Sequence, residues 1–486
     1  MKRHTSITLI FALILTLASC GGGTTAPVTT TGNEDSTTEA PETTQGISSE
    51  LPDVKYDGYE FTFLSSDEVG SLRYSPDLYA EEETGEPLND AVYKRNRIVE
   101  ERFGIKIVSR EVNKKNVMND FKTSVTAEDG AYDIVVSRID EILPAGSAYG
   151  AEISTLLYVD IEKPWWDGEV IKETAIGGKA YGLLGDINIV DNRSTWCVLF
   201  NKRLADEYKV GDLYETVKSG KWTIDELART AKLVAHEVNG DGKLDYHDQW
   251  GLLSSGSSVG SFLWGGGGSF GRTDSKGGVE LTIDSERNLS VLTKLYDLLA
   301  NRDFVLDVST VQKENGMTNF EILHSVFNEG RGLYISGIIG YIEYFRDMDD
   351  EFGILPVPKY DEEQNDYTHT IQEASGTMFM APKNAPDLER TSVILEALAS
   401  ASVSTLTPAY YDIMLQRKLT HDDESKEMLD LIFSTRTFDA VYCYNWGKVR
   451  TIQNLLTAES NTLASSIASI KTAAQTELDN YIKELN

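Results

Sequence analysis

The sequence is poor in basic residues compared with acidic ones. Its 486 residues include 45 Lys and Arg against 77 Asp and Glu, which gives a formal net charge of -32. Nucleic-acid binding needs a basic surface that displaces counterions from phosphates, so this deficit excludes that class of partner. The same field repels anionic ligands and leaves neutral or cationic ones.

Cysteine is scarce as well, with only Cys20, Cys197 and Cys443 in the chain. A chain of this length buries enough apolar surface to fold without disulfides. We expect Cys197 and Cys443 to be two small buried hydrophobic residues. A disulfide between them outside the cell remains the alternative, because nothing in the sequence fixes their separation.

Long hydrophobic runs are missing after the first 20 residues. A membrane-spanning helix needs about 20 apolar residues, and the nearest candidate, 333–345, is interrupted by glycines and by Glu343. Catalytic motifs are also missing: there is no P-loop, no H-E-x-x-H and no C-x-x-C. The G-x-S-x-G match at 256–260 and the G-x-G-x-x-G match at 266–271 lack the strand and helix context that those motifs require. We therefore expect that the protein is not an enzyme.

The N-terminus has the parts of a secretory signal peptide. Lys2 and Arg3 precede the apolar stretch 7–17, and Ala18 and Ser19 follow it. This order of a basic, an apolar and a small-residue region predicts a leader over 1–19. The run Leu-Ala-Ser-Cys that ends at Cys20 resembles the bacterial lipobox, which implies lipidation of Cys20 and an extracytoplasmic, membrane-anchored lipoprotein. An ordinary signal cut after Ser19 is the alternative.

The segment 20–50 is rich in Thr, Ser, Gly and Pro and has almost no apolar residues. Such a composition cannot bury enough surface to order itself. We expect a flexible tether between the anchor and the folded body.

Alternating strand and helix patterns begin after the tether. They predict strands at 59–64, 105–108 and 133–136 and helices at 89–103 and 116–128. Strand, helix, strand, helix, strand at these spacings indicates a mostly parallel sheet in an α/β protein.

Further along the chain, Thr223 and Glu226 form the pattern of a helix N-cap. Asp284 is expected to cap the helix that contains the apolar positions of 289–299, and 352–357 is expected to be a buried strand. From 467 to 485 apolar residues recur every three or four positions, which predicts a helix that packs on the body.

Several short motifs recur in an order that carries more information than any one of them. They are 88–96 (Leu-Asn-Asp-Ala-Val-Tyr-Lys-Arg-Asn), 163–167 (Lys-Pro-Trp-Trp-Asp), 178–182, 199–202, 220–223, 353–359 (Gly-Ile-Leu-Pro-Val-Pro-Lys) and 409–412. Together they resemble extracellular solute-binding protein family 1, the maltose-binding-protein-like receptors of carbohydrate ABC importers.

The resemblance implies an α/β fold of two lobes, joined by hinge crossings, with a ligand cleft between the lobes. It places the crossings near 189–199 and 355–358. Lobe 1 would comprise 51–190 and 357–415, and lobe 2 would comprise 191–356 and 416–486.

The function implied by the resemblance is capture of a sugar or oligosaccharide by lobe closure, followed by delivery to the importer's permease subunits. We expect a monomer. The same fold also serves non-sugar ligands such as peptides or polyamines, and this alternative stays open because fold does not decide chemistry. A secreted carbohydrate-active enzyme is the least favoured reading.

Sugar sites combine aromatic platforms with planar groups that form paired hydrogen bonds. Trp446 occupies a place that resembles the platform on the second lobe of the family, and Trp264 precedes four glycines, 265–268, that let backbone approach a ligand. The complete set of candidate ligand-binding residues is Trp446, Trp264, Trp196, Asp186, Arg331, Glu373 and Tyr411. The competing interpretation is that the tryptophans are core residues and the charges are solvated.

An EF-hand-like loop spans 237–248. Positions 1, 3, 5, 6, 7, 9 and 12 of that pattern are occupied by Glu237, Asn239, Asp241, Gly242, Lys243, Asp245 and Asp248. Calcium prefers six to eight oxygen ligands at this spacing, so we expect a structural calcium ion. Glu at position 1 and Asp at position 12 depart from the usual pattern, and a glycine turn with solvated acids is the alternative.

Overall fold

The computed structural model describes residues 46–48, 50–68, 74–311, 316–416, 423–458 and 460–485. The predicted leader, Cys20 and most of the tether lie outside these residues. The body from Glu42 to Asn486 forms one unit by its internal contacts.

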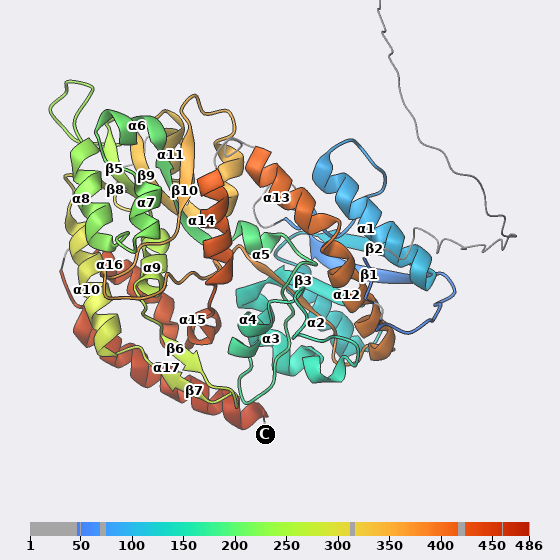
Figure 1. Ribbon diagram of the computed structural model, residues 1–486. Coiled ribbons are helices and arrows are strands. Elements are labelled where there is room, and N and C mark those ends of the chain that lie inside the picture. Colours follow the sequence, from blue (N-terminus) through green and yellow to red (C-terminus); the bar gives the residue numbers. More distant parts are fainter. Residues whose placement is uncertain are drawn as a thin grey trace, which may run out of the picture. The chain divides into compact units, whose positions relative to one another are not determined.

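The first sheet is built as the sequence predicts. Strand β1 (Tyr59–Ser66), helix α1 (Pro87–Phe103), strand β2 (Ile105–Val112), helix α2 (Val117–Ala127) and strand β3 (Ile134–Arg138) follow in order. β1 pairs in parallel with β2 and β3, and β11 (Thr377–Met380) joins β3 in the antiparallel sense. The order is β11-β3-β1-β2, so a late segment of the chain completes the sheet (Figure 1).

Local signals explain where α1 begins and ends. The Glu86 side chain accepts a hydrogen bond from the Asn89 N–H at 2.8 Å, and Pro87 fits the first helical turn, where its missing N–H costs nothing. Gly104 ends the helix at φ 61°, a conformation that glycine adopts without strain.

The second sheet has the order β10-β4-β9-β5-β8. Its strands are β4 (Trp196–Asn201), β5 (Trp250–Ser254), β8 (Val305–Asp307), β9 (Gly332–Ile338) and β10 (Phe352–Leu355). β5 is parallel to β8 and β9, whereas β4 is antiparallel to β9 and β10. Every residue of these strands is buried, as expected for a sheet that is covered on both faces.

Helices cover the second sheet on both sides (Figure 1). They are α6 (Lys202–Glu207), α7 (Leu213–Lys218), α8 (Ile224–Val234), α9 (Gly256–Gly265), α10 (Glu286–Ala300) and α11 (Asn319–Asn328). The 3-10 helix η3 (Ile339–Tyr344) follows directly after β9. The Thr223 side chain caps α8 by accepting from the Glu226 N–H. The predicted cap of α10 is wrong by one residue, because Ser285 rather than Asp284 accepts the Asn288 N–H.

The remaining elements sort by their contacts into two lobes. Lobe 1 is the first sheet with α3 (Ile139–Tyr149), η2 (Ile153–Thr155), α4 (Gly168–Glu173), α12 (Leu388–Ser402) and α13 (Leu406–Gln416). Lobe 2 is the second sheet with the hairpin β6 (Gly271–Thr273) and β7 (Val279–Leu281), and with α14 (Asp423–Ser434), α15 (Ala440–Tyr444), η4 (Trp446–Thr451), α16 (Ile452–Leu456) and α17 (Leu463–Leu485). α12 and α13 contact α1, whereas α14 contacts β10.

The chain crosses between the lobes at two described places. Helix α5 (Val190–Arg193) leads into β4, where Trp196 N–H donates to the Thr370 carbonyl at 3.1 Å. The return crossing lies beside it, because Gln372 N–H donates to the Ser194 carbonyl at 2.8 Å. These two segments therefore form the hinge.

The sequence predicts the second crossing near 355–358, but the chain does not leave lobe 2 there. Trp222 Nε1 donates to the Pro356 carbonyl at 2.8 Å, and Lys359 N–H donates to the Trp222 carbonyl at 3.1 Å. These bonds keep the chain on lobe 2 well beyond the end of β10. The proline-rich end of the strand marks a turn on lobe 2 and not a lobe boundary.

Cys197 and Cys443 are both buried free thiols, as the sequence analysis favoured. Within the described ranges, no helix is both long and apolar enough to cross a bilayer.

Candidate functional site

The carboxyl ends of the strands define the candidate site. In open α/β sheets, ligands bind in the crevice outside these ends. In lobe 1, β1 and β3 end at Ser66 and Arg138, and in lobe 2 β5 and β9 end at Ser254 and Ile338. Helices α3 and α9 and the 3-10 helix η3 begin within two residues of these positions.

Lobe 1 has a cavity of about 220 Å³ at this edge. Its lining consists of the ends of β1 and β3, the start of α2 and the start of β11: Ser66, Glu68, Ser75, Lys114, Lys115, Val117, Val136, Ser137, Arg138, Glu141 and Thr377. Small-molecule sites usually measure about 300–1,000 Å³, so this cavity suits one end of a larger ligand.

An ion network links this edge of lobe 1 to lobe 2. Arg138 Nε donates to Asp140 at 3.0 Å, and its guanidinium lies 3.2 Å from Glu141. Arg450, in η4 of lobe 2, donates to the other Asp140 oxygen at 2.9 Å and lies 3.5 Å from Glu373 at the hinge. Two arginines and three carboxylates therefore meet where the lobes face each other.

Within this network, the carboxyl group of Glu373 has a strongly raised pKa. Burial raises its pKa to about 7, against the opposing effect of the Arg450 guanidinium. Near neutral pH, Glu373 can therefore either donate or accept a hydrogen bond.

Lobe 2 contributes a hydrogen-bonded pair beside Arg450. Gln453 Nε2 donates to the Tyr442 hydroxyl at 2.5 Å, and Arg450 Nε donates to the Tyr442 carbonyl at 3.0 Å. A Cβ at Gly260 of α9 would lie 2.7 Å from the Gln453 amide. Glycine at this position lets α9 and α16 approach closely.

Aromatic side chains gather at the carboxyl end of the lobe 2 sheet. Phe320 and His324 come from the first turns of α11, and Tyr341 and Tyr344 come from η3. The Phe320 and Tyr344 rings lie 5.1 Å apart at an interplanar angle of 80°. Each of these two residues is 39 % exposed, so the pair offers apolar ring surface to a ligand.

His324 lies inside this aromatic cluster, with its ring 3.7 Å from Phe320 and 4.4 Å from Tyr341. Burial lowers its pKa to about 3, so it is neutral at physiological pH. The cluster is therefore an uncharged surface. Sequence reasoning missed it because Phe320 and His324 at helical spacing are typical of a core-facing stripe.

The tryptophans expected to stack on a ligand are core residues in the structure. Trp446 is 6 % exposed and is covered by Tyr444 at 4.7 Å and Tyr481 at 5.7 Å. Trp264 is 3 % exposed and donates through Nε1 to Asp439 at 3.1 Å. Trp196 is buried in β4 at the hinge. Their rings pack against neighbouring side chains and do not present the exposed face that stacking on a ligand needs.

Arg331 does not fit the expected role either. It immediately precedes β9, at the end of the sheet opposite the candidate site. Its Nη1 donates to the Tyr246 carbonyl at 2.7 Å and to the Asp248 carbonyl at 2.9 Å. Arg331 therefore fixes the end of the EF-hand-like loop.

Asp186 and Tyr411 lie beside the hinge and away from the ion network. Burial raises the pKa of Asp186 to about 6, and the negative charge of Asp167 adds to this rise. Tyr411 packs edge-on against Phe433 at 5.8 Å. Of the seven predicted ligand-binding residues, Glu373 is the one that the structure joins to the network. Arg138, Asp140 and Glu141 were missed, although a strand that ends in a polar cluster is a recognisable signal.

The EF-hand-like loop is closed at its base by the pairing of His236 with Gln249. Glu237 and Asn239 accept from backbone N–H groups within the loop, as do Asp241 and Asp245. Asp248 is fully buried and accepts from the Val238 N–H at 3.0 Å. Among the described residues, no three His, Cys, Asp or Glu side chains converge as metal ligands.

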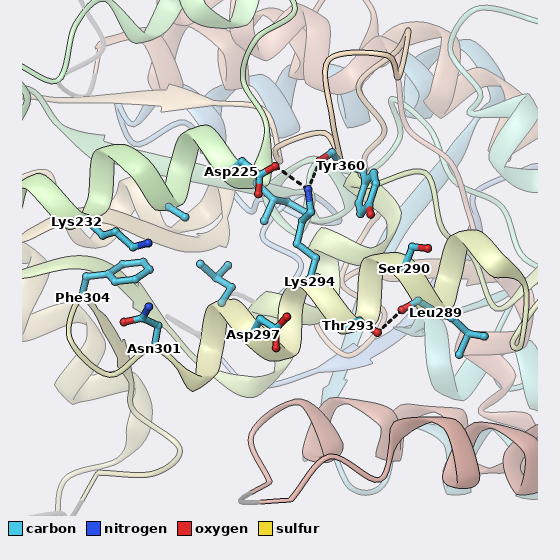
Figure 2. Close-up of a pocket in the computed structure, with 13 residues that line it drawn as sticks. Asp225, Lys232, Leu289, Ser290, Thr293, Lys294, Asp297, Asn301, Phe304 and Tyr360 are labelled. Carbon is cyan, nitrogen blue, oxygen red and sulfur yellow. Dashed lines mark hydrogen bonds and ion pairs between the residues drawn. The ribbon is translucent and has the colours of Figure 1, made fainter.

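A larger cavity of about 760 Å³ lies on lobe 2 between α8 and α10 (Figure 2). Lys294 spans it by donating to Asp225 at 2.8 Å and to the Tyr360 carbonyl at 3.0 Å. Lys294 and Arg287 also lie 4.1 and 4.7 Å from the Tyr360 ring centre. The Phe304 ring, which also lines the cavity, is 2 % exposed and has the Lys232 ammonium 5.1 Å from its centre. Neither ring therefore offers the exposed face found at Phe320 and Tyr344.

Comparison by sequence found no matching family model and no curated relative. Comparison by structure found many solved chains. The ABC substrate-binding protein Lmo0181 of Listeria monocytogenes, in complex with cycloalternan, has a TM-score of 0.55 and 14% identity over 87% of this chain and 99% of its own. The cyclic α-maltosyl-1,6-maltose binding protein of Arthrobacter globiformis has a TM-score of 0.56 and 14% identity over 87% and 100%.

A third neighbour, UgpB of Mycobacterium tuberculosis in complex with glycerophosphocholine, has a TM-score of 0.56 and 14% identity over 88% of this chain and all of its own. At such identity the likeness shows the fold. The chain has the two-lobed α/β fold of solute-binding proteins, over nearly the full length of each of these neighbours.

Proposed function

We propose that the protein is a receptor of an ABC importer that captures a sugar or oligosaccharide between its lobes and is not an enzyme. One observation carries the proposal: the carboxyl edges of the two sheets combine an exposed aromatic pair with an arginine and carboxylate network. Aromatic faces bind the C–H surface of sugars, and planar charged groups form paired hydrogen bonds with vicinal hydroxyls.

The chemistry of the network favours a neutral ligand. Arg138 and Arg450 are already paired with Asp140, Glu141 and Glu373. A charged ligand group would have to break one of these pairs, whereas hydroxyl groups can donate to the carboxylates and accept from the guanidinium groups. The structural likeness to proteins solved with cycloalternan and with maltotetraose supports the same class.

Ligand that contacts both lobes would favour the joined arrangement by its differential affinity. A monomeric receptor of this kind would then deliver the ligand to permease subunits in the membrane. The alternative is the same receptor fold with a non-sugar ligand such as a peptide or polyamine, and the net charge of -32 would favour a cationic one.

The sugar class can be tested by thermal melting with mono- and oligosaccharides, peptides and polyamines. Ligand bound to the native state raises the melting temperature. We expect a shift with a glycan, and we expect Arg138→Gln to weaken that binding about tenfold or more, a loss of about 1.4 kcal/mol. Arg110→Gln, an exposed arginine in β2, is the matched control and should leave binding unchanged. A shift of the melting temperature with a peptide or polyamine, and none with any glycan, would support a receptor function and contradict a sugar as its ligand.

Calcium at the loop 237–248 is a second proposal. It is supported by the spacing of the oxygen-bearing residues and by Gly240 and Gly242, whose φ values of 80° and 75° permit the sharp turn. Calcium should raise the melting temperature, and Asp241→Ala should abolish that rise, whereas Asp225→Ala on α8 should not. If a chelator never changes the melting temperature of the wild type, the loop is a glycine turn without metal.

Membrane anchoring through Cys20 is the third proposal, and it is supported by the lipobox-like sequence alone. Replacement of Cys20 by Ser should move the protein from the membrane fraction to the soluble fraction after cell lysis. Continued sedimentation with membranes would show that another feature of the chain holds it there.

A further inference from the structure

The two lobes meet at a second contact, outside the ion network of the candidate site. Glu173, the last residue of α4 in lobe 1, points its carboxylate at the segment between α14 and α15 of lobe 2. The carboxylate accepts a hydrogen bond from the Thr437 hydroxyl at 3.1 Å and another, shorter one from the Phe438 N–H. The Glu173 carbonyl also accepts from the Thr273 hydroxyl at 2.7 Å.

We propose that this contact is a proton-dependent latch, which holds the lobes together when Glu173 is protonated and loosens when it is ionised. The proposal rests on the proposed function only in that separation of the lobes opens the ligand cleft.

The surroundings of Glu173 disfavour its negative charge. It lines a cavity of about 350 Å³ at the junction of the lobes, together with Trp264, Ser269 and Arg272. Burial raises its pKa to about 7, and the Phe438 N–H and Thr437 hydroxyl only partly oppose this rise. The charged neighbours with the largest effect, Asp439 and Glu169, are both acidic and raise it further.

The other charged groups around the latch are paired elsewhere. Arg436 of lobe 2 binds Asp167 of lobe 1 at 2.6 Å and approaches Asp191 at 3.5 Å, so this ion pair also joins the lobes but does not involve Glu173. Lys172, one residue before Glu173, pairs at the surface with Glu162 and Glu169. On β6, the exposed Arg272 directs its Nε to the Ser269 hydroxyl at 3.4 Å.

Three other buried acids, Asp186, Asp439 and Glu373, titrate in a similar range but differ in their partners. Asp186 faces the Arg436 guanidinium, whose positive charge opposes the rise of its pKa to about 6. Burial raises the pKa of Asp439 to about 6, yet its hydrogen-bond donors, Trp264, Phe270 and Tyr442, all belong to lobe 2. Its environment therefore changes little when the lobes separate. Glu373 faces the Arg450 guanidinium, so its charged form has a partner in the joined lobes.

The direction of the effect follows from the pKa of Glu173 in the two arrangements. With the lobes joined the pKa is about 7, against 4.5 for a solvent-exposed Glu. The joined arrangement therefore gains its full stabilisation below pH 4.5 and loses it as the pH rises through 7. From pH 5.5 to 8.5 the equilibrium constant for separation should increase roughly tenfold or more.

The test measures the distance between the lobes without any ligand. Lys106 of β2 and Leu233 of α8 would each be replaced by an unnatural amino acid that bears a ketone. A nitroxide label would then be attached to each ketone, which leaves the native cysteines unmodified. Both sites are exposed, at 65% for the Lys106 side chain and 45% for Leu233. Double electron–electron resonance on the full-length chain then gives the joined and separated populations at pH 5.5 and 8.5.

In the wild type, the separated population should grow strongly between the two pH values. Glu173→Gln keeps an acceptor oxygen without the charge, so it should stay joined at both. Glu162→Gln, which removes a surface charge from the same region, should behave as the wild type. The latch would be refuted if the wild-type distance distribution did not change with pH. It would also be refuted if the distance distribution of the Glu173→Gln variant changed with pH as much as that of the wild type. Because no ligand is used, failure of the sugar proposal leaves this result unaffected.

Discussion

The proposed site depends on the ion pairs that the Arg450 guanidinium forms. This guanidinium comes from lobe 2, and it pairs with Asp140 on the first turn of α3 and with Glu373 at the return crossing. The Arg450 side chain is 23% exposed and that of Asp140 is 10% exposed, so the pair is partly buried, and removal of one partner leaves the other charge without its counter-charge. This one side chain therefore ties together a lobe 1 helix, the hinge and the η4 segment.

Around this link, the two lobes supply different chemistry. Lobe 1 offers a small polar cavity whose charges are already paired, and lobe 2 offers the exposed rings of Phe320 and Tyr344. A chain of sugar units needs both, because each ring has an apolar face and a rim of hydroxyl groups. The proposed latch at Glu173 adds a third element, since the pH would then bias the same lobe movement that a ligand favours in the proposed function.

Much of the fold could be predicted from the sequence, because its local signals agree with its tertiary structure. The alternation that begins at β1 and the Gly104 helix stop both appear where expected. The site was harder to predict. Trp446 and Trp264 are aromatic and lie in suggestive motifs, yet burial against Tyr481 and Asp439 depends on contacts with distant segments.

The same reason explains the position of the second crossing. Pro356 looks like a boundary, but a bond from Trp222, more than a hundred positions earlier in the chain, holds the segment on lobe 2. Arg138 and Arg450 likewise become partners of one carboxylate only after folding. A sequence pattern reports local preferences, whereas a site that spans two lobes is made by long-range contacts.

The most direct test of the account is a crystal structure with the glycan that stabilises the protein most. The account predicts one end of the glycan in the lobe 1 cavity beside Arg138 and a sugar ring against the Phe320 and Tyr344 pair. A glycan found instead in the groove between α8 and α10, with the carboxyl edges of both sheets free of ligand, would contradict it.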